Sequence, residues 1–234
     1  MKSLQKSLDV LEYVVLQNGE KVTPSRIAKA LSLNLATCTR IMGEFVKRGY
    51  LIQVSRKDGY LPGPMIASLV TRRNPCERLA DAARDPIREL SETLRRQVNL
   101  AVMNRNRRIM LTYHLGQYDL KPWDHFFFSS DHWDTATGRL LIAALDDREA
   151  RKILAETGIR PFPRKELEAM RENGSVRFRL GELEIIGHAV RVPGCPAAAF
   201  GFGVEPEQAD EAFAASSETA RRIIRALEQP NQAY

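Results

Sequence analysis

The stretch LSLNLATCTRIMGEFVKRGYLIQVSRKDGYLPGP, residues 31–64, combines a short turn, an amphipathic helix and a hairpin. Apolar side chains at helical spacing predict the buried side of a helix over residues 35–48: Leu35, Cys38, Ile41, Met42 and Phe45. Gly49 ends this helix, and residues 50–54 then read as a strand. An Asp-Gly pair in the turn at residues 55–59 predicts a return strand starting at residue 60.

Two further helices precede this stretch. The first spans residues 4–16, with an apolar stripe of Leu4, Leu8, Leu11 and Val15. The second begins at Thr23-Pro24, where threonine suits the N-cap and proline suits the first helical position. Helix, helix, short turn, helix and hairpin is the order of a winged helix-turn-helix, which we predict for residues 1–73.

The positive charge of the chain is concentrated in the same segment. Residues 1–73 hold 12 Lys and Arg against 5 Asp and Glu, whereas the remaining residues hold 23 against 24. A basic unit joined to a near-neutral one indicates a polyanionic partner for the basic unit. A basic surface that only maintains solubility, or a three-helix bundle with no role on DNA, is the alternative.

A winged helix-turn-helix would place its third helix in the major groove of double-stranded operator DNA. Thr37, Thr39 and Arg40 could then contact base edges or phosphates, while Ser25 and Arg26 would meet phosphate at the start of the second helix. The predicted DNA-contacting residues are Ser25, Arg26, Asn34, Ala36, Thr37, Thr39, Arg40, Arg56 and Lys57. The last two lie in the wing turn and would reach the backbone or the minor groove.

Beyond residue 73 the pattern changes to strands interleaved with helices, which predicts an α+β domain. A long helix is expected over residues 76–97, with Pro86 as an internal break or kink. Strands are expected at 98–103, 109–113, 184–192 and 197–204, and helices at 147–156, 164–172 and 207–228.

Three runs, SLQKSLDVLEYV (residues 3–14), LSLNLATCTRIMGEFVKRGYL (31–51) and DGYLPGP (58–64), resemble the opening helix, recognition helix and wing of IclR-type transcriptional regulators. The resemblance implies a bacterial repressor or activator in three parts: a winged helix-turn-helix at 1–73, a linker helix at 74–96 and a GAF-like antiparallel sheet with helices at 97–234. The last part would bind a small-molecule effector and form a homodimer or homotetramer. Leu35 and Ala36 depart from the family, which usually has polar residues there.

By matching to the family, the effector would lie between the start of a helix near residue 135 and the last two strands. The matched residues are Thr135, Ala136, Thr137, Gly138, Glu184 with Glu182 as its alternative, His188, Gly201 and Gly203. The free N–H groups of a helix start suit a carboxylate. Many relatives carry serine at the positions of the two strand glycines. The absence of these serine hydroxyl groups here argues against a small, polar oxo-acid as the effector. We expect an organic acid or an aromatic metabolite.

Residues 123–134, WDHFFFSSDHWD, form an unusual aromatic segment. They could wall a ligand pocket, pack in the core or a dimer interface, or bind zinc through His125 and His132 with a carboxylate. The spacing is not diagnostic of a metal, and the three cysteines form no CxxC pair. We therefore predict no metal, no cofactor and no catalytic residue.

Two other functions remain as alternatives: a metal-dependent hydrolase that uses His125, His132 or His188, or a pure oligomerisation module. No nucleophile elbow, P-loop or metal helix motif supports a hydrolase. No run of 18 apolar residues and no signal-peptide cleavage site occur, which predicts a cytoplasmic protein without a membrane partner.

Overall fold

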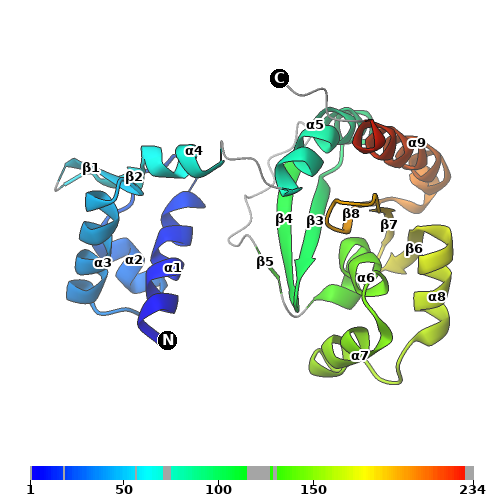
Figure 1. Cartoon of the computed structure of the whole chain (residues 1–234), viewed down its shortest axis with the longest axis horizontal. Helices are drawn as coiled ribbons and strands as arrows, with labels where there is room; N and C mark the ends of the chain where they lie inside the picture. Colours follow the sequence, from blue (N-terminus) through cyan, green and yellow to red (C-terminus); the bar gives the residue numbers. More distant parts are fainter. Residues whose placement is uncertain are drawn as a thin grey trace. The chain divides into compact units, whose positions relative to one another are not determined.

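The computed structural model describes residues 2–17, 19–55, 57–70, 75–114, 127–128 and 131–229, with only the backbone for 2, 70, 75, 112–114 and 127–128. The contacts between residues divide the chain into two compact units. Helices α1 to α4 with a small hairpin build the first unit, and helices α5 to α9 with a larger sheet build the second (Figure 1).

The first unit follows the predicted order of elements. It contains α1 (Lys2–Val15), α2 (Pro24–Ala30), α3 (Leu35–Lys47), β1 (Leu51–Ser55), β2 (Gly59–Pro62) and α4 (Pro64–Val70). The two strands form an antiparallel hairpin. This arrangement confirms the winged helix-turn-helix, and α4 is an additional helix that we did not predict.

Side-chain caps fix where α2 and α3 begin. The Thr23 hydroxyl accepts a hydrogen bond from the Arg26 backbone N–H at 3.4 Å, and the Asn34 carboxamide oxygen accepts one from the Ala36 N–H at 2.9 Å. Each cap satisfies a backbone donor that has no partner within its helix. Between the two helices Ser32 adopts a φ of 52°, the left-handed conformation that allows the short turn.

The core of the first unit is formed by Val10, Val14, Val22, Ile27, Ala28, Cys38, Met42, Leu51 and Tyr60. The predicted stripe of α1 is therefore partly wrong, since Leu4 and Leu8 are 67% and 47% exposed. Leu35 is also exposed, at 52%, although we expected it in the core. It is the first residue of its helix, where no preceding turn covers its side chain.

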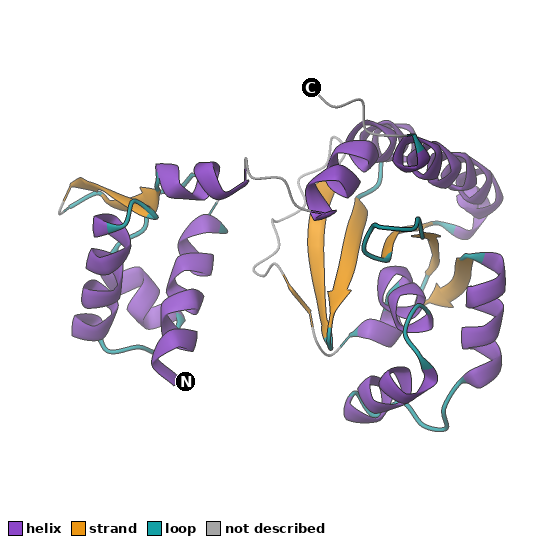
Figure 2. Cartoon of the chain, viewed as in Figure 1, coloured by secondary structure: helices purple, strands orange, loops and turns teal. Residues whose placement is uncertain are grey.

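The second unit is an antiparallel sheet with helices. Its helices are α5 (Pro75–Leu94), α6 (Ala136–Ala143), α7 (Asp147–Glu156), α8 (Arg164–Asn173) and α9 (Ala209–Glu228), with short 3-10 turns η1 (His132–Asp134) and η2 (Pro206–Gln208). Its strands are β3 (Val98–Asn104), β4 (Arg107–His114), β5 (Phe127–Phe128), β6 (Ser175–Leu180), β7 (Leu183–Val190) and β8 (Ala198–Val204). They are arranged in the order β5-β4-β3-β8-β7-β6 (Figure 1). Figure 2 shows the same strands in orange and the helices in purple.

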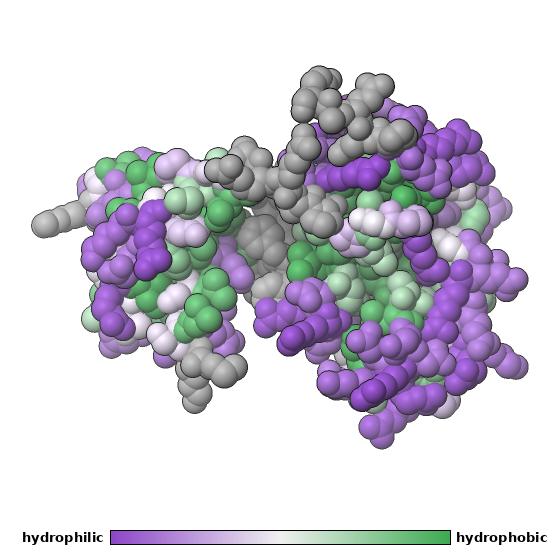
Figure 3. All heavy atoms as spheres, viewed as in Figure 1, coloured by the Kyte–Doolittle hydropathy of each residue, from purple (hydrophilic) through white to green (hydrophobic). Residues whose placement is uncertain are grey.

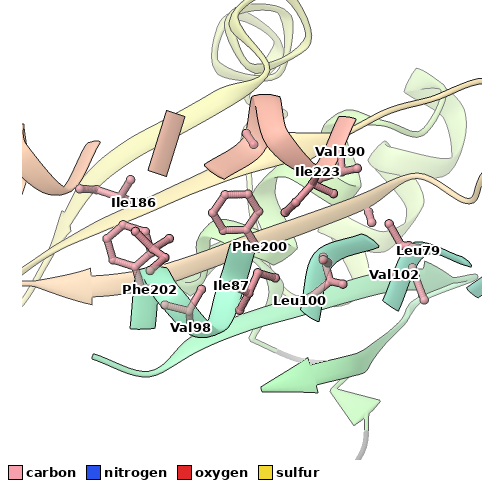
Figure 4. Close-up of a cluster of buried hydrophobic side chains, with 14 of the residues drawn as sticks. Leu79, Ile87, Val98, Leu100, Val102, Ile186, Val190, Phe200, Phe202 and Ile223 are labelled. Carbon is pink, nitrogen blue, oxygen red and sulfur yellow. The ribbon is translucent and has the colours of Figure 1, made fainter. Parts of the chain in front are cut away.

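One face of this sheet packs against α5 and α9. Figure 4 shows Ile87 of α5 and Ile223 of α9 meeting Leu100 and Phe200 of the strands, all four of them buried. The long helix α5, which we expected as a linker, contributes its apolar stripe to this core. It continues as one α-helix through Pro86, where we expected a break or kink.

The opposite face of the sheet consists largely of small residues. Ala101, Ala189 and Ala199 point to this face and pack with α6, α7 and α8. Gly187 and Gly201 lie on the same face, next to Ala136 at the start of α6. With so little side-chain volume on the strands, α6 rests almost directly on the backbone of β7 and β8.

The sheet also contains a strand that we did not predict. β6 has the sequence SVRFRL, in which Val176 and Phe178 alternate with Arg177 and Arg179, and it pairs with β7 along its whole length. The alternation is typical of a half-exposed edge strand.

The outer surfaces are polar where helices face solvent. In the view of Figure 3, hydrophilic side chains dominate the surface over α7, α8 and α9. Every helix among the described residues is too short or too polar to span a bilayer.

The close approach of α6 to the sheet predicts a steric effect of Gly187→Ala. A Cβ atom there would lie 2.5 Å from the Ala136 Cβ and 2.8 Å from the Phe200 carbonyl oxygen, so we expect a loss of about 1–3 kcal/mol in the free energy of unfolding. Urea denaturation followed by circular dichroism measures this loss. Gly203→Ala is the matched control, because its Cβ would meet the flexible ends of Ile185 and Leu183, at 3.1 and 3.3 Å. Equal losses in both variants would contradict the proposed packing.

Candidate functional site

The outer face of α3 carries most of the predicted DNA-contacting side chains. Ala36, Thr39 and Arg40 are exposed, and Gly43 and Lys47 continue the same stripe at helical spacing. Thr37 is half-buried, so less of its side chain is accessible to DNA than we expected. Arg40 forms no ion pair with any carboxylate in the described part of the chain, so its guanidinium group is available to an anion.

Several of the predicted residues already form hydrogen bonds within the protein. Arg26 donates to Glu20 at 3.1 Å and to Gln17 at 2.8 Å, and the hydrogen bond to Glu20 raises its pKa. Asn34 uses its side-chain oxygen as the cap of α3, which leaves its NH₂ group as donor. Thr39 donates to the Leu35 carbonyl at 2.9 Å, so its oxygen and methyl group remain for a ligand. Arg26 would have to exchange Glu20 for phosphate.

The wing turn is held by one serine. The Ser55 hydroxyl accepts hydrogen bonds from the backbone N–H groups of Lys57 and Asp58, at 3.2 and 2.8 Å, and donates to the Asp58 carboxylate. This arrangement leaves the side chain of Lys57 exposed at the tip. Arg56, the other predicted wing residue, lies outside the described residues.

The predicted effector residues at the start of α6 are packed rather than open. The Thr135 hydroxyl caps the helix by accepting from the Gly138 N–H at 3.2 Å and also accepts from Arg108. Ala136 and Thr137 are only 2% and 4% exposed. We expected the backbone N–H groups at this helix start to face a carboxylate. Because the Thr135 hydroxyl already accepts from one of them, the helix start has fewer free donors for an anion than its sequence suggests.

The structure also separates the predicted effector residues into two groups. Gly201 and Gly203 share the face of α6, whereas Glu184 and His188 point to the opposite face, since successive side chains of a strand alternate. Glu184 pairs there with Arg177 at 3.1 Å. The expectation that all these residues line one pocket is therefore corrected, because the sheet lies between them.

His188 is a structural residue of the core. Its Nε2 lies 2.8 Å from the Ser216 hydroxyl, and its ring is 5.6 Å from that of Phe200 and 5.2 Å from that of Phe213. Ser216 donates its own proton to the Phe213 carbonyl at 3.1 Å, so His188 is the donor in this pair. With the serine fully buried and its proton engaged, the pair does not have the geometry of an activated nucleophile.

The predicted aromatic segment is described only in part. His132 is fully buried, and its Nε2 donates to the Asn106 carbonyl at 2.9 Å, so this nitrogen is engaged. Burial lowers the pKa of His132. His125 lies outside the described residues, and no group of three His, Cys, Asp or Glu among the described ones is placed to bind a metal ion.

A cavity of about 460 Å³ opens beside the start of α6, on residues outside the predicted effector set. Its lining comprises Trp133, Arg139, Ile159, Pro161, Phe162, Pro163, Arg164, Lys165 and Glu166. Arg139 follows the predicted small-residue segment by one position, and Trp133 belongs to the aromatic segment. The sequence signal was therefore present, but the loop between α7 and α8 that completes the cavity carries no motif.

No family model matches the sequence, and no curated protein does. Solved structures do match. An IclR homologue from Microbacterium hydrocarbonoxydans, solved in complex with 4-hydroxybenzoate, has a TM-score of 0.71 at 20% identity, over 97% of this chain and 100% of that chain. The fold is that of IclR-type regulators.

Two further structures have the same IclR-type fold. A transcriptional regulator of this type from Alicyclobacillus acidocaldarius has a TM-score of 0.69 at 17% identity, over 97% of this chain and 98% of that one. IclR of Thermotoga maritima has a TM-score of 0.64 at 20% identity, over 97% and 99%. These neighbours are transcriptional regulators, and each likeness extends over both units of the chain.

The buried His188 predicts a pH-dependent stability. Burial lowers the pKa of His188 from 6.5 to about 4, so between these values the unfolded chain takes up a proton that the folded chain excludes. The stabilisation is complete above pH 6.5 and is lost as the pH falls toward 4, by up to about 3 kcal/mol. His188→Phe should flatten this part of the stability profile in urea denaturation at a series of pH values. An unchanged slope in the variant would assign the pH dependence to other groups.

Proposed function

We propose that this protein is a bacterial transcriptional regulator of the IclR family, which binds double-stranded operator DNA through its first unit and a small-molecule effector through its second. The observation that carries the proposal is the exposed stripe of α3 in the unit with the excess positive charge. The IclR-type fold of the chain supports it.

The described residues of the first unit suit a duplex. Arg40 can donate two parallel hydrogen bonds to a guanine edge, and the Thr39 methyl group can contact thymine. The Asn34 NH₂ group, Ser25, Arg26 and Lys57 lie exposed around α3 and would contact phosphates. Leu35 and Ala36, both exposed, would bring an apolar surface to the groove instead of polar side chains.

We expect the regulator to act in the cytoplasm as a homodimer or homotetramer. Exposed apolar side chains in the first unit support a contact between copies: Leu4 and Leu8 of α1, and Met65 and Leu69 of α4. Two-fold operators also require paired recognition helices. The effector class we propose is an organic acid with an aromatic body, as 4-hydroxybenzoate is for the Microbacterium hydrocarbonoxydans homologue.

The alternative functions have less support. A hydrolase would need an accessible base, and of its three candidate histidines His188 and His132 are both buried, while His125 lies outside the described residues. A pure oligomerisation module would not bind a small molecule, so a ligand-dependent rise in melting temperature would count against it.

Arg40→Ala tests the DNA interface. Removing the guanidinium group should cost about 1–3 kcal/mol of specific affinity, because a bidentate base or phosphate contact is lost. A mobility-shift assay measures this cost, first with fragments upstream of the protein's own gene and then with a genomic fragment library. Wild-type binding should weaken steeply as salt rises.

Arg148→Ala is the matched control, since Arg148 is an exposed arginine on α7 of the second unit. Its affinity should stay at the wild-type value. Equal losses in both variants would exclude Arg40 from the interface, and no binding to any fragment at low salt would refute a DNA-binding function.

A further inference from the structure

The cavity beside α6 combines an apolar body with positive charge. Ile159, Pro161, Phe162, Pro163 and Trp133 supply an apolar and aromatic lining around a volume of about 460 Å³, within the range of small-molecule sites. The lining includes three cationic side chains, Arg139, Arg164 and Lys165, and one carboxylate, Glu166. The lining therefore has an excess of positive charge.

Arg139 is the cation of this cavity for which the described residues provide no ion pair. It is half-buried, its Nε donates to the Trp133 carbonyl at 2.6 Å, and its guanidinium carbon lies 3.4 Å from the centre of the Phe178 ring. No carboxylate in the described part of the chain forms an ion pair with it, and burial lowers its pKa by more than the charges of Asp134 and Glu166 raise it. The stacking and the hydrogen bond fix the plane of the group, which is the preorganisation that recognition of a carboxylate requires.

The other cations are arranged differently. Arg164 already pairs with Asp147 at 3.2 Å and with Glu168 at 3.7 Å, so its charge is largely compensated. Its guanidinium carbon also lies 6.0 Å from the ring of Phe162, and that of Arg151 lies 4.1 Å from the same ring. Phe162 is thereby held at the cavity wall. Lys165 is exposed and adds a mobile positive charge.

We propose that this cavity binds an aromatic monocarboxylate, with Arg139 as the partner of the carboxylate and Trp133 and Phe162 as contacts of the ring. The inference deepens the proposed function, because it rests on a ligand-responsive second unit and gives the ligand a location. That location is the flank of α6 formed by η1 and the loop between α7 and α8. It differs from the predicted site on β7 and β8, where Ala136 packs against the strand glycines.

Isothermal titration of the full-length chain with benzoate tests the site. We expect one benzoate per chain, and at least about tenfold weaker binding for benzamide, which lacks the charge, and for acetate, which lacks the ring. Absence of benzoate binding up to about 10 mM would overturn the proposal. Equal affinity for benzamide would overturn the role of the carboxylate.

Arg139→Met locates the site, since it removes the charge and keeps an extended apolar side chain. We expect benzoate affinity to fall at least about tenfold, whereas Arg221→Met, an exposed arginine on α9, should change it less than about twofold. Undiminished binding by folded Arg139→Met protein would overturn the assignment.

A second measurement decides the matter if Arg139→Met does not fold. The chain has two tryptophans, so Trp123→Phe leaves Trp133 as the only tryptophan fluorophore. Benzoate should change its emission, and Phe162→Ala should weaken that response at least about tenfold. An unchanged emission with benzoate bound would place the ligand elsewhere. Mobility shifts without benzoate report on DNA binding independently, so failure of the cavity and failure of the regulator are distinguishable.

Discussion

The packing of α6 against the sheet is the contact on which the second unit depends. Ala136 meets Gly187 and Gly201 so closely that a Cβ atom at either glycine would lie within 3 Å of its methyl group. Alanines on the neighbouring strands keep the same face flat. The opposite face carries large side chains such as Phe200 and Phe202, which pack with α5 and α9. One face therefore allows a helix to approach the strand backbone closely, whereas the other fills the space to its helices with large side chains.

This contact also decides where a ligand can bind. Residues that suit an anion in sequence, at the first turn of α6, are buried, and Thr135 caps the turn from within. A cavity opens instead where the flank of α6 meets η1 and the loop before α8. Gly187 and Gly201 admit the helix to the strand backbone, and Arg139 is a polar group beside the open space.

The sequence predicted most elements but fewer of the contacts. Caps and turn residues such as Thr23, Asn34 and Gly59 act locally, so α2, α3 and the hairpin followed directly from the sequence. The face to which a residue of β7 points could not be predicted in the same way. Both faces of that strand are covered, so Ile185, Ile186, Ala189 and Val190 give no alternation. His188 was therefore assigned to the wrong side, and the cavity needed a loop whose position depends on tertiary packing.

Arginines that form no ion pair with a described carboxylate occur in both units. In the second unit most arginines in contact with other elements have a carboxylate: Arg177 pairs with Asp210, Arg222 with Glu89 and Arg171 with Asp147. Such pairs hold helices and strands together at little net cost. An arginine that forms no ion pair with a described carboxylate is different, because more of its charge remains available to a partner outside the chain. Arg139 meets this condition in an aromatic cavity, which suits a carboxylate with a ring. Arg40 meets it on an open helix face, which suits an extended polyanion.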